Sequence, residues 1–219
     1  TLVTAHRLDL VWVVDDNFLV DARRAVEIGE GLVRRGLNFR WSIQATTNLV
    51  CKLSVEELKL LRRSGLYQIC HGAESASASV LAAMNKSWQT SEMIHEAARR
   101  CAEAGIRPSF NIIFGYPGET EEDRRETVDA VCAMCERYPG VEFWTNIFTP
   151  YPGSPVMCRA AALGLEIPGS LEGWADFFPR YTVLPWLHGR EHRRVQNMRD
   201  CLRFAYARET IAVGPNGIG

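Results

Sequence analysis

Strand-like and helix-like segments alternate along most of this chain, and this alternation limits the possible folds more than any other feature. Five apolar, β-branched segments read as strands, and each leads through a turn into a segment with helical spacing. The strands are expected at Leu10–Val14, Phe39–Gln44, Tyr67–Cys70, Arg107–Phe114 and Val141–Phe148. Because successive βαβ units form parallel sheets, the pattern predicts an α/β fold whose strand-end turns share one edge.

Helix signals divide the chain into two parts. Ser54 and Glu57 form a capping box before a helix that reaches Arg63, and Thr120 can cap a helix that reaches about Tyr138. Further helices are expected over Val20–Arg35, Ser77–Met84, Ser91–Ala104 and Arg190–Thr210. The regular alternation stops near residue 155. We therefore expect a core over residues 1–155 and a loop-rich, helical extension over residues 156–219.

Composition excludes several classes of protein. The 219 residues carry a net charge of −1, so no excess of basic residues is available to neutralise nucleic-acid phosphates. Seven scattered cysteines and the lack of a signal peptide favour the reducing cytoplasm over a disulfide scaffold. No apolar run is long enough to span a membrane. The chain begins with Thr1 rather than Met, and we interpret it as a fragment of a longer protein.

Two of the strand-end turns carry carboxylates. The sequence DDNF places Asp15, Asp16 and Asn17 where they can accept hydrogen bonds from an amine or a hydroxyl, although an Asx turn with a helix cap is the simpler interpretation. The sequence GAES places Glu74 after Gly72, which permits close approach of a ligand or backbone. A carboxylate there can bind the two hydroxyls of a ribose. Capping of the next helix by Ser75 is a compatible alternative.

The other two turns are rich in proline and glycine. In GYPGET, Pro117 fixes φ and Gly118 permits a left-handed turn, so the backbone can lie flat against a planar ring, with Glu119 at its edge. Either Ile112 and Phe114 or Asn111 and Ile113 would line that surface. The sequence TPYPGSP is rigid and offers backbone groups to a ligand. Each turn alone is explained by ordinary turn and cap chemistry, whereas the set indicates a binding site.

Three other patterns have weaker claims. The sequence HGREH, from His188 to His192, matches the H-x-x-E-H spacing of a zinc peptidase, but Gly189 weakens the helix and a solvated helix start is favoured. Cys132 and Cys135 have C-x-x-C spacing without a second pair, so we expect core cysteines. None of the three lysines, Lys52, Lys59 and Lys86, is expected at a strand end, which argues against a Schiff-base barrel enzyme.

In order, VVDDNF, GAES with VLAAMNK, FNIIFGYPGETEED and FTPYPGSP resemble the radical S-adenosylmethionine (radical SAM) superfamily. The nearest group usually carries a cobalamin-binding domain upstream, and the resemblance covers about Leu10–Pro155. It implies a partial TIM-type barrel of six βα units, of which about five are expected here. It also implies a [4Fe–4S] cluster on C-x-x-x-C-x-x-C that reduces S-adenosylmethionine to a 5′-deoxyadenosyl radical.

The resemblance implies site residues. Asp16 and Asn17 would lie near the methionine end of S-adenosylmethionine, and Glu74 would face its ribose. The other expected S-adenosylmethionine-binding residues are Gln44, Ser75, Ile113, Gly115, Pro117, Gly118, Glu119, Thr149, Pro150 and Tyr151. No catalytic side chain is assigned. Asn111 replaces the usual first glycine of the family's G-x-I-x-G-x-x-E pattern, and Glu119 falls one residue late.

The cluster motif is absent from the sequence. We therefore expect the first strand, the cluster cysteines and a cobalamin-binding domain upstream of Thr1, and we expect Leu10–Val14 to form an unpaired edge that makes the chain alone poorly soluble and inactive. The resemblance implies a cytoplasmic enzyme with S-adenosylmethionine, a cluster and, in the nearest group, cobalamin, acting on a small-molecule substrate without nucleic acid or a membrane span.

The implied reaction is methyl transfer to, or rearrangement at, an unactivated carbon. One alternative is a methylthiotransferase-like radical SAM enzyme, although the helical, aromatic tail differs from the RNA-binding β module expected there. Another is a non-catalytic barrel that only binds a nucleotide-like ligand.

Overall fold

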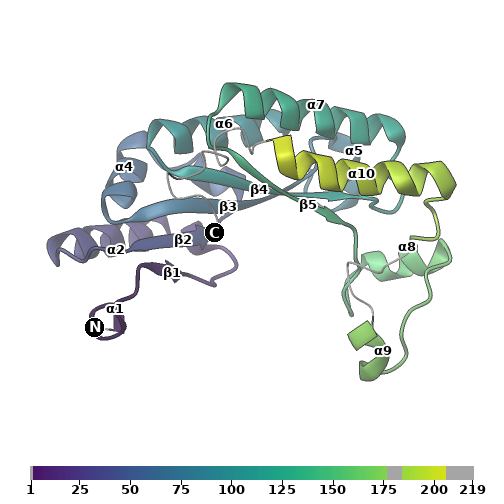
Figure 1. The fold of residues 1–219 in the computed structure, drawn as a ribbon, viewed down its shortest axis with the longest axis horizontal. Coiled ribbons are helices and arrows are strands. Elements are labelled where there is room, and N and C mark those ends of the chain that lie inside the picture. The colour runs from purple at the N-terminus through teal and green to yellow at the C-terminus, as the bar shows by residue number, and fades with distance from the viewer. Residues whose placement is uncertain (1, 177–183, 206–219) are drawn as a thin grey trace, which may run out of the picture.

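A computed structural model describes residues 2–176 and 184–205 of the chain. Its centre is a parallel sheet of five strands in chain order, which curls into half of a barrel (Figure 1). The strands are β1 (Leu10–Trp12), β2 (Arg40–Gln44), β3 (Leu66–Glu74), β4 (Arg107–Phe114) and β5 (Glu142–Ile147). The predicted partial TIM-type barrel with five βα steps is confirmed.

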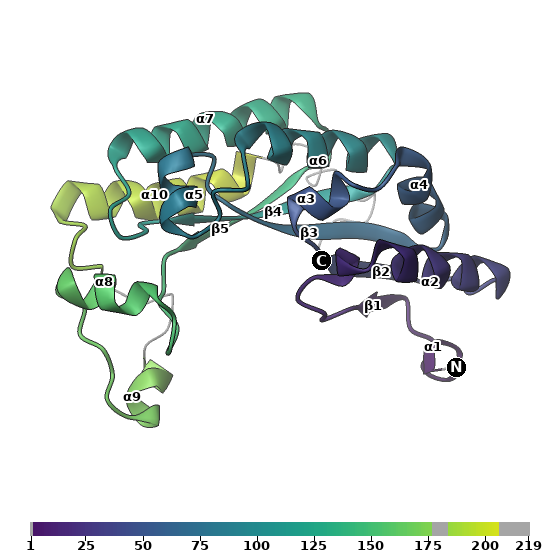
Figure 2. The ribbon, with the colours of Figure 1, turned by 180° about the vertical axis from the view of Figure 1, so that it is seen from behind.

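Helices cover the convex face of the sheet, as Figures 1 and 2 show from opposite sides. The short N-terminal helices are α1 (Leu2–His6) and the 3₁₀-helix η1 (Phe18–Val20), and the helices around the sheet are α2 (Ala22–Arg34), α3 (Thr47–Val50), α4 (Val55–Arg63), α5 (Ala78–Ala83), α6 (Ser91–Glu103) and α7 (Glu121–Arg137). In the extension, α8 (Val156–Ala162) and α9 (Leu171–Asp176) lie beyond the end of β5, and α10 (Gly189–Ala205) packs beside it.

Alternation along the strands separates a core face from a concave face. On β4 and β5, Phe110, Phe114 and Phe143 are fully buried beneath the helices. On β2 and β3, Ile43 and Ile69 are fully buried in a second core cluster. The intervening residues point to the concave side, because successive side chains of a strand point to opposite faces. In the part of the chain that the structure describes, the helices packed against β2 to β5 thus lie on the opposite face, and the concave side is left for a ligand.

Helix caps follow the sequence signals. Ser54 and Glu57 form the predicted capping box of α4, and Thr120 caps α7 with Asp123 completing a second box. Two differences matter. The predicted loop after β2 forms the short helix α3, and β3 continues four residues beyond the predicted end at Cys70. The last five residues of the predicted helix Arg190–Thr210 lie outside the described residues. Within the described chain, no helix is long and apolar enough to cross a bilayer.

Candidate functional site at the carboxyl edge of the sheet

The turn after β1 is tied to the next strand rather than left open. Asn17 donates through Nδ2 to Thr46 Oγ1 at 3.2 Å and accepts through Oδ1 from the Thr46 backbone N–H at 3.3 Å. Asp15 forms an exposed ion pair with Arg24 at 3.1 Å, while Asp16 is exposed. Asp21, not Asn17, provides the side-chain cap of α2. The side chain of Asn17 therefore fixes the turn and Asp16 remains available to a ligand.

Glu74 lies at the end of β3 in a strained backbone conformation. Its φ is 65°, a left-handed value that is costly for a residue with a side chain. Its Oε1 forms an ion pair with Lys86 Nζ at 2.8 Å, and Nζ also donates to the Gly72 carbonyl at 3.1 Å. A Cβ on Gly72 would lie 2.6 Å from Oε1 of Glu74, so any larger residue would displace this carboxylate from its present position. The pair is partly buried and faces the strand end.

Lys86 is a residue that the sequence interpretation missed. It follows the MN of the VLAAMNK segment and lies twelve residues beyond Glu74, so nothing in the strand pattern marks it. The chain folds back after α5 and places the ammonium group of Lys86 at the end of β3. Its place as the last residue of the VLAAMNK segment was the available signal, and the expectation that no lysine lies at a strand end is wrong for Lys86.

Ser75 does not reach the surface of this edge. It is fully buried, its Oγ lies 2.9 Å from Thr127 Oγ1 of α7, and it accepts from the Ser77 backbone N–H. The expected cap of α5 by Ser75 is therefore wrong, because Ser77 occupies the N-cap position without a side-chain cap bond. Ser75 positions the turn and is not placed to contact a ligand directly.

The turn GYPGET is held from several sides. Gly115 and Gly118 have φ values of 82° and 87°, which confirms the expected left-handed turn. Trp186 donates its indole N–H to the Gly115 carbonyl at 3.0 Å, and Tyr116 donates its hydroxyl to the Ala83 carbonyl at 3.0 Å. The backbone after β4 is therefore fixed by contacts with both α5 and the extension, and Pro117 is buried within it.

Glu119 is folded back into this turn and does not point outward from its edge. Its side chain is 1% exposed, and Oε2 accepts from the Gly115 backbone N–H at 2.6 Å. The Arg124 guanidinium lies 3.3 Å away and is equally buried. Burial raises the pKa of the Glu119 carboxyl to about 7, and this effect outweighs the opposing influences of Gly115 and Arg124.

Asp123 joins two of the turns. Its Oδ1 accepts from Ser77 Oγ at 2.6 Å and from Ser79 Oγ at 2.5 Å, while Oδ2 accepts from the backbone N–H of Thr120 at 2.8 Å. Burial acts to raise the pKa of Asp123, but these hydrogen bonds outweigh it and hold the pKa well below its usual range. The carboxylate thereby connects the start of α7 with the start of α5.

The turn after β5 completes the edge. The Phe148 backbone N–H donates to the Phe114 carbonyl at 2.8 Å, so this turn continues beside GYPGET. Thr149 is half-buried, Pro150 is buried and Tyr151 is exposed. Ile113 faces the concave side beside Asn146 of β5 and is partly buried. The parallel sheet thus brings the four predicted turns to one edge, although each is fixed mainly by its own neighbours.

Gln44 lies deeper, in a cavity of about 380 Å³ on the concave face. The lining residues are Leu10, Trp12, Ser42, Gln44, Tyr67, Gln68, Cys70, Asn111 and Trp144. Trp12 is 64% exposed and Trp144 is 55% exposed, an unusual state for indole rings. These rings come from β1 and β5, the opposite edges of the sheet, so the curvature of the half-barrel brings both to one space.

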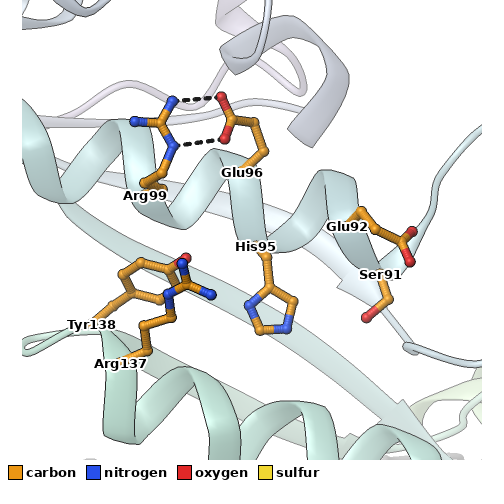
Figure 3. A pocket seen from close by; sticks show the side chains of 7 residues that line it. All are labelled: Ser91, Glu92, His95, Glu96, Arg99, Arg137 and Tyr138. Atoms are coloured by element: carbon orange, nitrogen blue, oxygen red, sulfur yellow. Dashed lines mark hydrogen bonds and ion pairs between the residues drawn. The ribbon is translucent and has the colours of Figure 1, made fainter.

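A second cavity, of about 440 Å³, lies on the outer helical face (Figure 3). His95 points from α6 toward α7, and burial, followed by the charge of Arg137, lowers its pKa. Glu96 is paired with Arg99 at 2.7 Å on the same helix. None of the strand-end residues lines this cavity. The candidate site therefore lies on the concave side and its carboxyl edge.

The described residues hold no cluster of three or more His, Cys, Asp or Glu able to bind a metal. The C-x-x-C cysteines and the histidines of HGREH therefore form no metal centre within the described residues. Cys132 is exposed on α7, so the expectation that both C-x-x-C cysteines are buried is wrong; Cys135 is half-buried. His188 precedes α10 and is exposed, as a solvated helix start requires. The seven cysteines are not gathered into the ligand set of an iron–sulfur cluster.

A curled parallel half-barrel with four polar or glycine-rich turns at its carboxyl edge has the architecture of a partial TIM-type α/β barrel. The chain belongs to the radical SAM superfamily, whose family model matches residues 5–131. The expected family is confirmed. Relatives in this superfamily are S-adenosylmethionine-dependent radical enzymes, so the fold and the family both support an enzyme.

Individual relatives are distant and much longer. An uncharacterized methyltransferase from Pyrococcus horikoshii is 25% identical over 88% of this chain and 39% of its own length. A tRNA-2-methylthio-N(6)-dimethylallyladenosine synthase from Bifidobacterium longum is 34% identical over 41% of this chain and 18% of its own length. The chain thus spans less than half of the curated relatives it matches.

Solved structures show the same fold. The radical S-adenosylmethionine methyltransferase TsrM from Kitasatospora setae, determined with cobalamin and a [4Fe–4S] cluster, superposes with a TM-score of 0.60 at 22% identity, over 73% of this chain and 32% of TsrM. The cobalamin-dependent S-adenosylmethionine radical enzyme OxsB gives a TM-score of 0.51 at 23% identity, over 57% of this chain and 19% of OxsB.

Proposed function

We propose that this chain is the S-adenosylmethionine-binding core of a cobalamin-linked radical SAM enzyme that transfers a methyl group to, or rearranges, an unactivated carbon. The observation that carries the proposal is the Glu74–Lys86 pair at the end of β3. The Glu74 backbone has a φ of 65°, and backbone strain of this kind is concentrated at functional sites. The ion pair with Lys86 fixes the direction of the Glu74 carboxylate. Its free lone pairs suit the two hydroxyls of a ribose.

The neighbouring residues fit the rest of S-adenosylmethionine. Ile113 and the glycine-rich backbone of residues 115–118 offer a flat apolar support for adenine, and Thr149 to Tyr151 offer backbone beside it. Asp16 provides an exposed carboxylate for the amino group of the methionine part, with Asn17 holding its turn. Gln44 and the two exposed tryptophans line the adjacent concave cavity, which is the space for the reacting part of a small-molecule substrate.

The cluster does not fit the residues of this chain. The described residues hold no cysteine triad, so its ligands are proposed to lie in a part of the protein outside these 219 residues. The bound cofactors would supply the radical chemistry, while this chain would bind, orient and shield the reactants from water. The methyltransferase name of the P. horikoshii relative and the cobalamin in TsrM and OxsB support the methyl-transfer class and a cobalamin-binding domain in the same protein.

The methylthiotransferase alternative is supported by the higher identity of the B. longum relative over a shorter segment. Anaerobic turnover of the full-length protein with S-adenosylmethionine carrying a labelled methyl group separates the two. Label recovered on cobalamin and then on a small molecule supports our proposal. Label recovered on tRNA, together with an added sulfur, supports the alternative.

Binding of S-adenosylmethionine to the full-length protein tests the site itself. Glu74→Gln and Lys86→Met should each weaken binding by about tenfold or more, because each removes a charged hydrogen-bonding partner from a partly buried pair. Lys59→Met is the matched control, since Lys59 forms an exposed pair with Glu56 on α4. Unchanged affinity in Glu74→Gln, or equal loss in the Lys59 control, would refute the assignment to ribose.

A further inference from the structure

The cavity of about 380 Å³ on the concave face has no charged residue in its wall. No Asp, Glu, Lys, Arg or His of the described residues lines it. Tyr67 and Cys70 are the titratable residues among those that do, and burial raises the pKa of the Cys70 thiol, which keeps this group uncharged. A charged group that entered the cavity would lose water without gaining a counter-ion, so the cavity favours a neutral ligand.

Three side-chain amides line the cavity, and one of them has a fixed direction. Gln44, Gln68 and Asn111 come from the neighbouring strands β2, β3 and β4. Nε2 of Gln68 donates to Glu142 Oε2 at 2.7 Å, and Glu142 is itself paired with Arg107 at 2.8 Å. Because an ionised carboxylate only accepts, the Gln68 amide has to direct its N–H groups toward Glu142 and its carbonyl oxygen away from it.

The polar atoms of these amides can be reached by a ligand. Oε1 of Gln68 accepts from no described residue and is not among the buried atoms that lack a partner, so it remains accessible. The side chains of Gln44 and Asn111 are half-buried and form no hydrogen bond within the described chain. The cavity thus offers a fixed acceptor from Gln68, and both donors and acceptors from Gln44 and Asn111.

Two indole rings add flat apolar walls to this polar floor. Trp12 belongs to β1 and Trp144 to β5, the two edges of the sheet, and the three amides lie on the strands between them. More than half of the surface of each tryptophan is exposed. Aromatic rings pack well against other rings, and a volume of this size accommodates a small organic molecule. Aromatic walls around a set of amides fit a planar ring with a polar edge.

We propose that this cavity binds a neutral, planar heteroaromatic ring whose edge carries both an N–H donor and a carbonyl acceptor. The ring packs against Trp12 and Trp144, its N–H donates to Oε1 of Gln68, and its carbonyl accepts from an amide N–H of Gln44 or Asn111. The role of this ring as the part of the substrate that enters the barrel rests on the proposed function. Binding of the ring itself requires neither S-adenosylmethionine nor a cluster.

Quinolin-2(1H)-one and its N-methyl derivative are matched probes, since the methyl group removes the N–H donor. Trp12 and Trp144 report binding by ¹⁹F NMR of the full-length protein labelled with 5-fluorotryptophan, with the two resonances assigned by their loss in Trp12→Phe and Trp144→Phe. The titration contains no S-adenosylmethionine or reductant. Quinolinone should shift both resonances saturably, with about tenfold higher affinity than the N-methyl derivative. Its carboxylated analogue should bind about tenfold more weakly, because no cation lines the cavity among the described residues.

Gln68→Leu should weaken quinolinone binding by about tenfold, because it removes the fixed acceptor. Gln196→Leu is the matched control, since Gln196 is a half-buried glutamine on α10 that does not line the cavity, and it should bind like the wild type. An unchanged melting temperature establishes that both variants fold. If Gln68→Leu is less stable, the comparison of the two probes in the wild type tests the same hydrogen bond without a substitution.

Equal affinities for quinolinone and its N-methyl derivative, or equal effects of the two glutamine substitutions, would overturn the proposal. So would the absence of a saturable shift at the solubility limit of quinolinone, which would mean that another segment of the full-length protein fills the cavity. The binding of S-adenosylmethionine is measured separately. A protein that binds S-adenosylmethionine but not quinolinone overturns this inference alone, whereas one that binds only quinolinone overturns the proposed function and retains the ring site.

Discussion

Glu119 shows how burial changes the chemistry of one carboxyl group. Its folded-state pKa of about 7 lies above the ordinary value of 4.5, so the folded protein binds this proton more tightly than the unfolded chain does. The resulting stabilisation is complete below pH 4.5 and is lost as the pH rises to 7. At roughly 1.4 kcal/mol per pKa unit, ionising this group costs about 3 kcal/mol of folding free energy.

Glu119→Gln should therefore be more stable than the wild type above pH 7, by about 1–3 kcal/mol, and the difference should shrink toward pH 4.5. Urea unfolding from pH 4.5 to 8.5 measures it. Buried His71, whose pKa is lowered to about 4, acts in the opposite sense but is common to both proteins and cancels in the difference. Glu122→Gln, an exposed change at the start of α7 just after this turn, is the control, and a wild-type-like profile for Glu119→Gln would contradict this account.

Gly72 is a second residue whose role follows from geometry. A Cβ at this position would meet Oε1 of Glu74 at 2.6 Å and Nζ of Lys86 at 3.2 Å. We expect Gly72→Ala to displace the pair and weaken S-adenosylmethionine binding by about tenfold. Gly31→Ala, in the last turn of α2 with only the end of the Arg34 side chain within 4 Å of its Cβ, should leave binding unchanged and stabilise the fold by about 0.5–1 kcal/mol. Equal binding by both variants would show that the Gly72 contact is irrelevant to the ligand.

At the scale of elements, Asp123 connects the beginnings of α5 and α7. Asp123→Asn keeps the shape but removes the charge that accepts from Ser77, Ser79 and Thr120. We expect a loss of about 1–3 kcal/mol in the free energy of unfolding, because the acceptor is buried and charged. Asp129→Asn, exposed on the same helix, should change stability by less than about 0.5 kcal/mol. Similar losses in both variants would mean that helix charge, not the link between turns, matters.

Periodicity predicts which elements form but not how their turns are filled. The strand Arg107–Phe114 has the predicted bounds, because its apolar run stops at Gly115, where the GYPGET turn begins. β3 runs on to Glu74 because β4 pairs with it through Gly72 and Glu74, a long-range contact that leaves no local signal. The buried position of Ser75 likewise depends on Thr127 of α7, and the position of Lys86 depends on Glu74. Glu119 folds inward onto Gly115 and Arg124, which lie close to it in the chain, but nothing in the turn pattern distinguishes this inward position from an outward one.

At the scale of the whole molecule, the order of the strands was predictable, whereas the cavities were not. In a TIM-type barrel each strand lies beside the one before it in the chain, and the five strands follow that order here. Bringing Trp12 and Trp144 to one cavity instead requires the curvature accumulated over the full sheet. A cavity of about 310 Å³ between Gly118, Arg159 and Trp186 requires the C-terminal extension, whose loop-rich start has no periodicity from which its position can be inferred.

The curled sheet also leaves β1 without a second neighbour among the described strands, as the sequence predicted. Leu10 of β1 is 46% exposed, and an exposed apolar edge pairs readily with another chain. We expect the 219-residue chain to aggregate and Leu10→Lys to reduce this, because a charged edge residue disfavours strand pairing. Leu171→Lys is the matched control, since Leu171 is 82% exposed on α9 away from the sheet. Light scattering against time measures both variants. A monodisperse wild-type chain, or equal improvement by both substitutions, would show that the β1 edge does not drive association.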